Sequence, residues 1–215
     1  MKLSGQILAK IDPEIIKQLC EIAPLMAKKD SSLWPLEQET INRLGWIDLP
    51  TKSRTLLPEL DALSAWTRSN GLTEIVLCGM GGSSLAPEVI AATYKKSLTI
   101  LDSTDPVQVN NSVPSDLNKA VIVVSSKSGT TIETLSQYEF YVSKFKQANL
   151  NPTEHIVIVT DPGTSLDVIA RNEGYKVVNA DPNVGGRFSA LSAFGLVPAA
   201  LIGVDISLLL DDAEK

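Results

Sequence analysis

Five short apolar runs, separated by stretches of helical character, constrain the fold of this chain more than any other feature. They are "EIVLCGM" (74–80), "LTILDS" (98–103), "AVIVVSS" (120–126), "HIVIVTD" (155–161) and "KVVNAD" (176–181). Runs that are apolar throughout, without alternation, are typical of parallel strands that helices cover on both faces. We therefore predict an α/β fold, with a five-stranded parallel sheet sandwiched by helices.

An N-terminal helical arm, residues 1–70, is predicted to precede this sheet. Apolar residues recur at helical spacing in "PEIIKQLCEIAPLMAKK" (13–29) and in "LLPELDALSAWTRSN" (56–70). Trp34 and Trp46, each near a proline, indicate an ordered segment that crosses a surface.

The sheet-forming domain is placed at residues 71–205. Residues 206–215 are interpreted as the start of a linker or helix that leads to a second domain.

Charge and cysteine content limit the possible partners. The 215 residues include 25 acidic and 19 basic side chains, a net charge of −6, which argues against nucleic acid as a partner. An acidic surface does not exclude a small anionic ligand. The longest apolar-rich run, 190–204, is shorter than the ~20 residues of a membrane span. Cys20 and Cys78 are predicted to be two buried, reduced thiols, and the protein is expected to be cytoplasmic.

Small, hydroxylated and acidic residues gather where the runs end. Ligands of open α/β sheets bind beyond the carboxyl ends of the strands, where the strand order reverses. A flavodoxin-like order, 2-1-3-4-5, places strands one and three side by side at that point. We therefore expect "GMGGSS" (79–84) and "SSKSGTT" (125–131) to face one another.

The second of these loops, 125–131, combines hydroxyls with a helix start. A long amphipathic stretch follows, so the orphan N–H groups and partial positive charge of a helix N-terminus are predicted to point into the loop. The loop also offers hydroxyl donors and a glycine that lets the backbone turn closely: Ser126, Ser128, Thr130, Thr131 and Gly129. Such a set is suited to a dianionic phosphate. Thr130 and Glu133 also fit a capping box, in which Thr130 caps the helix and Glu133 reaches back.

Two further loops are interpreted as ligand contacts. "GMGGSS" follows a strand and opens a helix, where a dinucleotide loop would lie, and Asp102 ends the second strand, where a ribose-binding acid belongs. A nicotinamide-dependent oxidoreductase is therefore an alternative, although the hydroxyl-rich loop has no task in a simple dinucleotide site. In "NVGGRFSALSAFG" (183–195), two glycines precede Arg187, whose guanidinium is suited to stabilising an oxyanion such as an enediolate.

Three motifs together, "GMGGSSLAPEV", "SSKSGTTIET" and "GGRFSALSAFGLVPA", resemble the sugar-isomerase (SIS) domain of glucose-6-phosphate isomerases. They are most similar to the bacterial type that also occurs fused to transaldolase, and the resemblance runs across residues 70–205. It implies a SIS fold and reversible conversion of glucose 6-phosphate to fructose 6-phosphate through an enediol, with no metal or organic cofactor. It also implies that the full-length protein is a homodimer.

The resemblance assigns roles residue by residue. Arg187 resembles the arginine that steadies the enediolate, and Glu133 the glutamate that helps to orient a ring-opening histidine. The phosphate-binding set is Ser83, Ser126, Lys127, Ser128 and Thr131, and close backbone approach is expected at Gly81, Gly82 and Gly186. Ser128 and Gly129 stand where many relatives carry Thr and an aromatic residue.

The family's catalytic glutamate, ring-opening histidine and a late lysine belong to a second domain, and we match none of them in this chain. The one histidine, His155, lies at the start of the fourth run and is interpreted as structural. We therefore expect the isolated chain to bind sugar phosphates weakly and to turn over slowly or not at all. A non-catalytic sugar-phosphate sensor is a further alternative, because single SIS domains serve in regulators.

Overall fold

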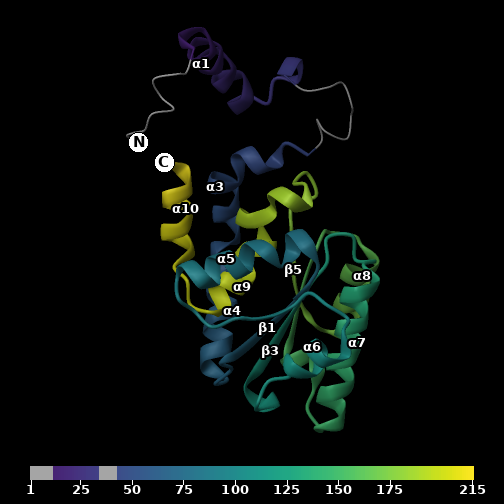
Figure 1. Cartoon of the computed structure of the whole chain (residues 1–215). Coiled ribbons are helices and arrows are strands. Elements are labelled where there is room, and N and C mark those ends of the chain that lie inside the picture. Colours follow the sequence, from purple (N-terminus) through teal and green to yellow (C-terminus); the bar gives the residue numbers. More distant parts are fainter. Residues whose placement is uncertain (1–11, 34–42) are drawn as a thin grey trace.

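A parallel β-sheet occupies the centre of the structure, a computed structural model that describes residues 12–33 and 43–215 (Figure 1). Its strands are β1 (Glu74–Gly79), β2 (Thr99–Leu101), β3 (Ala120–Ser125), β4 (Ile156–Thr160) and β5 (Lys176–Asn179). The order is β2-β1-β3-β4-β5, and every neighbouring pair is parallel. The predicted strands and the predicted order 2-1-3-4-5 are confirmed.

The strands are apolar throughout because both faces of the sheet are covered. All six residues of β3 are buried, and Val76 of β1 lies in register with Ile122 of β3 at the centre of the sheet. One face packs beneath α4 and α9, while α6, α7 and α8 cover the other (Figure 1).

Helices separate the strands, as predicted, and further helices precede and follow the sheet. In the described part of the chain they are α1 (Pro13–Ala27), α3 (Leu49–Lys52), α4 (Leu57–Ser69), α5 (Leu85–Thr93), α6 (Pro106–Asn111), α7 (Ile132–Gln147), α8 (Ser165–Glu173), α9 (Ala193–Leu201) and α10 (Ile206–Glu214). All nine residues of α9 are buried, which explains its nearly all-apolar sequence. None of the helices in the described ranges is long and apolar enough to cross a membrane.

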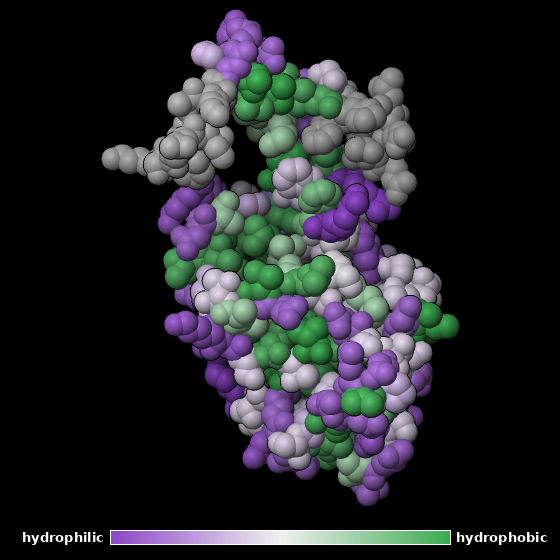
Figure 2. Space-filling view, in the orientation of Figure 1, coloured by the Kyte–Doolittle hydropathy of each residue, from purple (hydrophilic) through white to green (hydrophobic). Residues whose placement is uncertain are grey.

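Helix α1 forms where the helical spacing predicted it, but the structure shows none of its residues buried. Its apolar side chains lie at the surface (Figure 2), among them Ile15, Leu19 and Ile22. Cys20 is exposed on this helix, whereas Cys78 is buried in β1. The prediction of two buried thiols was therefore wrong for Cys20, because helical spacing alone does not reveal whether a helix packs on the core.

Residues 44–53 of the arm lie against the loop that follows β5. Leu44 forms an antiparallel bridge with Val184, and the Trp46 ring stacks on Phe188 with 5.3 Å between the ring centroids. The Ser53 hydroxyl donates to the carbonyl of Leu191. The segment that carries Trp46 thus crosses a surface of the domain, as predicted. Trp34 lies outside the described residues.

His155 lies just before β4, at the end of the sheet opposite the carboxyl ends of the strands. The ring is buried, its Nδ1 lies 2.9 Å from the carbonyl oxygen of Ala120, and it stacks on Phe145 with 4.7 Å between centroids. These contacts confirm that His155 is a structural residue.

The last helix, α10, packs on α3 and α9 through buried Ile206 and Leu210. The Arg54 guanidinium donates to Asp211 at 2.6 Å and to Glu214 at 3.0 Å. The residue at which the domain gives way to a linker stays a prediction.

Candidate functional site

A cavity of about 620 Å³ opens at the carboxyl ends of β1, β3 and β4. Four loops and Arg43 of the arm line it: Met80, Gly82 and Ser83; Ser125, Ser126, Lys127, Ser128, Thr131 and Thr134; Asp161, Pro162 and Thr164; Pro182 and Gly186. The loops that follow β1 and β3 therefore face one another, as the strand order predicted. Every member of the predicted phosphate-binding set lies at this cavity.

The loop between β3 and α7 carries a cluster of hydroxyls. The Ser126 hydroxyl donates to Thr131 Oγ1 at 3.3 Å, and the Thr130 hydroxyl donates to Ser128 Oγ at 3.1 Å. The backbone N–H of Thr130 also donates to Ser128 Oγ, at 3.2 Å. Because these side chains bond within the loop, they concentrate polar oxygen atoms at the start of α7. We call residues 126–131 the cradle loop.

The capping box predicted for α7 is absent. The N-cap is Thr131, one residue later than predicted, and it makes no side-chain capping bond. The first N–H groups of α7 therefore have no capping bond from the N-cap side chain. They carry the positive end of the dipole of a 16-residue helix toward the cavity. An anion placed there would satisfy both the N–H groups and the dipole.

Gly129 lets the cradle loop press against the β4–α8 loop. Its φ is +67°, and a Cβ at this position would lie 2.8 Å from Thr164 Cβ. The Ser165 hydroxyl donates to the Gly129 carbonyl at 3.2 Å. The close packing leaves no room for a larger side chain at this position.

Lys127 lines the cavity, but its ammonium group is engaged. Nζ donates to Asp161 Oδ2 at 2.7 Å, and the Asp181 carbonyl oxygen lies 3.4 Å from it. Burial raises the pKa of Asp161 above its usual value, although the Lys127 ammonium acts in the opposite direction. At neutral pH the 2.7 Å contact is that of an ion pair, so much of the charge of Lys127 is balanced within the protein.

The loop after β1 meets the loop after β5 through their backbones. A Cβ on Gly82 would lie 2.3 Å from the carbonyl oxygen of Gly186, and the Ser189 hydroxyl donates to that same oxygen at 2.6 Å. Gly81 has a φ of +57°. The two loops close one side of the cavity, and Ser83, in the loop after β1, also lines it.

Sequence comparison adds to this geometry. Residues 51–214 match the family Phosphoglucose isomerase. The chain belongs to that family. It is 34% identical over 211 residues to a glucose-6-phosphate isomerase of Thermus thermophilus, a match that covers 94% of this chain and 50% of the relative. The chain therefore spans about half the length of that relative.

Two solved structures resemble this member of the phosphoglucose isomerase family. A hypothetical protein of Thermus thermophilus superposes with a TM-score of 0.74 at 32% identity, covering 94% of this chain and 49% of that one. A glucose-6-phosphate isomerase of Chlamydia trachomatis gives a TM-score of 0.61 at 25% identity, covering 83% and 35%. The fold and the family therefore agree.

The two residues predicted to be catalytic, Arg187 and Glu133, lie beside the cavity and outside its lining. Arg187 is exposed at the start of the 3₁₀ helix Gly186–Leu191, directly after Gly186 on the cavity wall. Glu133 is half-buried in the first turn of α7. Their roles stay predictions.

Sequence reasoning missed five polar residues that line the cavity: Arg43, Ser125, Thr134, Asp161 and Thr164. The side-chain oxygens Ser125 Oγ, Thr134 Oγ1 and Asp161 Oδ1 are buried and have no hydrogen-bond partner among the described residues. Asp161 ends the fourth apolar run, so the rule that ligands lie at strand ends would have found it. Arg43 belongs to the arm, and no motif marked it.

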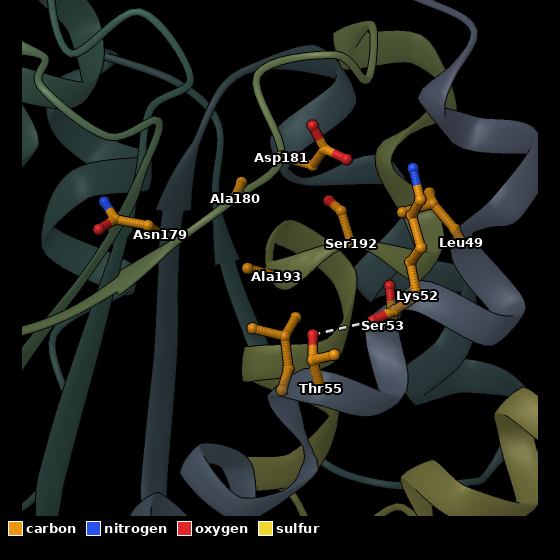
Figure 3. Close-up of a pocket in the computed structure, with 10 residues that line it drawn as sticks. Leu49, Lys52, Ser53, Thr55, Asn179, Ala180, Asp181, Ser192 and Ala193 are labelled. Carbon is orange, nitrogen blue, oxygen red and sulfur yellow. Dashed lines mark hydrogen bonds between the residues drawn. The ribbon is translucent and has the colours of Figure 1, made fainter.

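A second cavity of about 400 Å³ lies between the arm and the end of β5 (Figure 3). Its hydroxyls already donate to the backbone: Thr55 to the Lys52 carbonyl at 2.8 Å, and Ser192 to the Ser189 carbonyl at 2.7 Å. The Lys52 ammonium lies 3.2 Å from Asp48. We assign no ligand to this cavity because its polar groups are satisfied internally.

Proposed function

We propose that this chain provides the sugar-phosphate site of a glucose-6-phosphate isomerase, which interconverts glucose 6-phosphate and fructose 6-phosphate. The observation that carries the proposal is the hydroxyl cluster at the N-terminus of α7, which opens onto the cavity of about 620 Å³. A cavity of this size is in the range of small-molecule sites. Family membership supplies the reaction class.

The phosphate group would lie in the cradle loop. The hydroxyls of Ser126, Ser128 and Thr131 can turn from their present partners to donate to phosphate oxygens. The first N–H groups of α7 would donate to the same dianion, and the helix dipole favours its charge. Ser83, which lines the same cavity from the loop after β1, would add a further hydroxyl to the sugar-phosphate site.

Arg187 would act on the sugar. Isomerisation removes a proton from C2 of the open-chain aldose, and the electron pair left behind forms an enediolate whose negative charge rests on oxygen. A proton delivered to C1, together with transfer of the hydroxyl proton from O2 to O1, then completes the ketose. The Arg187 side chain is exposed next to the cavity wall, so its guanidinium can reach out to stabilise that oxygen.

Glu133, in the first turn of α7, would orient the group that opens the sugar ring. We assign the proton-transferring base to no residue of this chain. No metal or organic cofactor is included in the proposal, and the full-length protein is proposed to be a cytoplasmic homodimer. These last points rest on the resemblance to the family.

The test is a calorimetric titration of the chain with fructose 6-phosphate, compared with the double variant Ser126→Ala, Thr131→Ala. Removing two phosphate donors is expected to weaken binding at least tenfold, since each bond to a charged group contributes about 1.5–3 kcal/mol. The matched control is Ser143→Ala, Thr153→Ala, which removes two hydroxyls that bond to Gln147 and Asn151, away from the cavity.

Saturable binding that only the first variant loses would support the site. Equal binding by both variants would refute it. NAD and fructose 6-phosphate are also compared for their ability to protect the chain from thermal unfolding. Protection by NAD alone would favour the alternative of a nicotinamide-dependent oxidoreductase, which family membership disfavours.

A further inference from the structure

The cradle loop is attached to the β4–α8 loop by reciprocal contacts between Lys127 and Asp161. The Lys127 ammonium donates to Asp161 Oδ2 at 2.7 Å, and the Asp161 backbone N–H lies 3.4 Å from the Lys127 carbonyl oxygen. One residue earlier, the Ser126 N–H donates to the Val159 carbonyl at 3.0 Å. Side chain and backbone therefore hold the same two segments together.

This ion pair is largely shielded from water. The exposed fraction is 22% for the Lys127 side chain and 14% for that of Asp161. Removing one partner of a shielded pair leaves the other charge without compensation, which is costly. The pair therefore has one strongly preferred arrangement, unlike an exposed pair, whose partners exchange freely with water.

The pair also fixes where Lys127 points. Its Nζ is held between the Asp161 carboxylate and the Asp181 carbonyl, in the loops that follow β4 and β5. Its backbone lies between Ser126 and Ser128, whose hydroxyls face the start of α7. A side chain anchored at its tip restricts the backbone that carries it, so the position of both hydroxyls depends on the anchor.

We propose that Asp161 is a positioning residue: by anchoring Lys127, it holds the cradle loop in the geometry that receives phosphate. The inference deepens the proposed function and rests on it for the identity of the ligand. The proposal explains why an acidic residue lines a cavity that is proposed to bind an anion, since its negative charge by itself would repel that ligand.

The charge of Asp161 and its positioning role predict opposite changes in ligand affinity when Asp161 is replaced, so a titration distinguishes them. By charge alone, Asp161→Asn removes a carboxylate next to the cavity, so a dianion should bind more tightly. By positioning, the same substitution releases Lys127 and the cradle loop, so the dianion should bind more weakly. The chain offers a matched control in Asp181→Asn. Asp181 is close enough for its charge to raise the pKa of Asp161, but only its backbone carbonyl contacts Lys127.

The first measurement is amide hydrogen exchange of the ligand-free chain. We expect Asp161→Asn to speed exchange in residues 126–131 several-fold, with residues 120–124 of β3 and the Asp181→Asn variant unchanged. Unchanged exchange in 126–131 would overturn the inference, whether or not any ligand binds. The readout is independent of the proposed function.

The second measurement is the titration with fructose 6-phosphate. We expect Asp161→Asn and Lys127→Met each to weaken binding about three- to tenfold, and the double variant to be no weaker than the worse single variant, because both remove one anchor. Equal or tighter binding by Asp161→Asn would overturn the inference. Failure of the unchanged protein to bind would instead refute the proposed function and leave hydrogen exchange to decide the role of Asp161.

Discussion

The carbonyl oxygen of Gly186 lies against Gly82, so close that a Cβ on Gly82 would come within 2.3 Å of it. The contact joins the loops that follow β1 and β5, which are more than a hundred residues apart in sequence, and the Ser189 hydroxyl spans it with a 3.3 Å bond to the Gly82 carbonyl. Glycine is needed at position 82 for space, whereas neighbouring Gly81 has the positive φ.

Gly82→Ala is therefore expected to destabilise the chain. The added methyl group must push the two loops apart, at a cost of about 1–3 kcal/mol, and the melting temperature should fall by several degrees. Gly186→Ala is the control, because a Cβ on Gly186 would meet nothing within 4 Å. Thermal unfolding of both variants checks this, and an equal fall for the two would contradict the steric explanation.

Stacking of Trp46 on Phe188 is expected to hold the arm against the loop that carries Arg187. A double-mutant cycle with Trp46→Ala and Phe188→Ala should give a coupling energy of about 1 kcal/mol in urea unfolding, the usual contribution of an aromatic pair. Trp46→Ala should also speed hydrogen exchange in residues 183–189. Strictly additive effects of the two substitutions would show that the rings do not support one another.

Replacing His155 should reduce stability without affecting ligand binding. His155→Ala removes the contact with the Ala120 carbonyl and the stacking on Phe145, and we expect a loss of about 2–3 kcal/mol. The affinity for fructose 6-phosphate should stay within twofold of that of the unchanged protein, because the ring lies at the far end of the sheet. A large loss of affinity in a folded variant would assign this residue to the site.

Asp167 is expected to make stability depend on pH. Hydrogen bonds from the Gly163 N–H and from Asn179 and Arg171 hold its pKa below the ordinary value of 3.8. A lowered pKa in the folded state contributes stability above pH 3.8, and that contribution is lost as the pH falls through the folded-state pKa.

Asp167→Asn should therefore destabilise the chain by about 2 kcal/mol at pH 7, and the difference should shrink as the pH falls below 4. Urea unfolding between pH 7 and pH 3 measures both quantities. Asp61→Asn, on the exposed face of α4, provides a control that should change little at either pH. A difference in the free energy of unfolding that grows as the pH falls would contradict a lowered pKa of Asp167.

Local patterns predicted the sheet and its edge. The apolar runs became the five strands because burial on both faces admits few polar side chains, and the hydroxyl-rich ends came together because parallel strands share a carboxyl edge. That rule marked the cradle loop and the loop after β1, and the resemblance to the family singled out Ser83 and two glycines within the latter. His155 was correctly separated from the site by its place at the start of a strand.

Contacts between distant segments were beyond local patterns. The capping box predicted at Thr130 is absent because α7 begins one residue later, with Thr131 at the N-cap. The prediction that Cys20 is buried was wrong because an apolar stripe indicates a helix without indicating what packs against it. Arg43 reaches the cavity from the arm and carries no motif of its own, whereas Asp161 lies at the end of an apolar run, where the strand-end rule places ligands.

The sequence by itself determined the strands and the loop that presents hydroxyls to a helix start, because each depends on residues near one another in the chain. The strand order was predicted from the fold type that the alternation of strands and helices indicates. Only the tertiary structure decided how that loop is held. The Lys127–Asp161 pair, the Gly82–Gly186 contact and the Trp46–Phe188 stack each join segments that are distant in sequence. Such contacts form only after the sheet has brought those segments together, so their partners cannot be read from spacing along the chain.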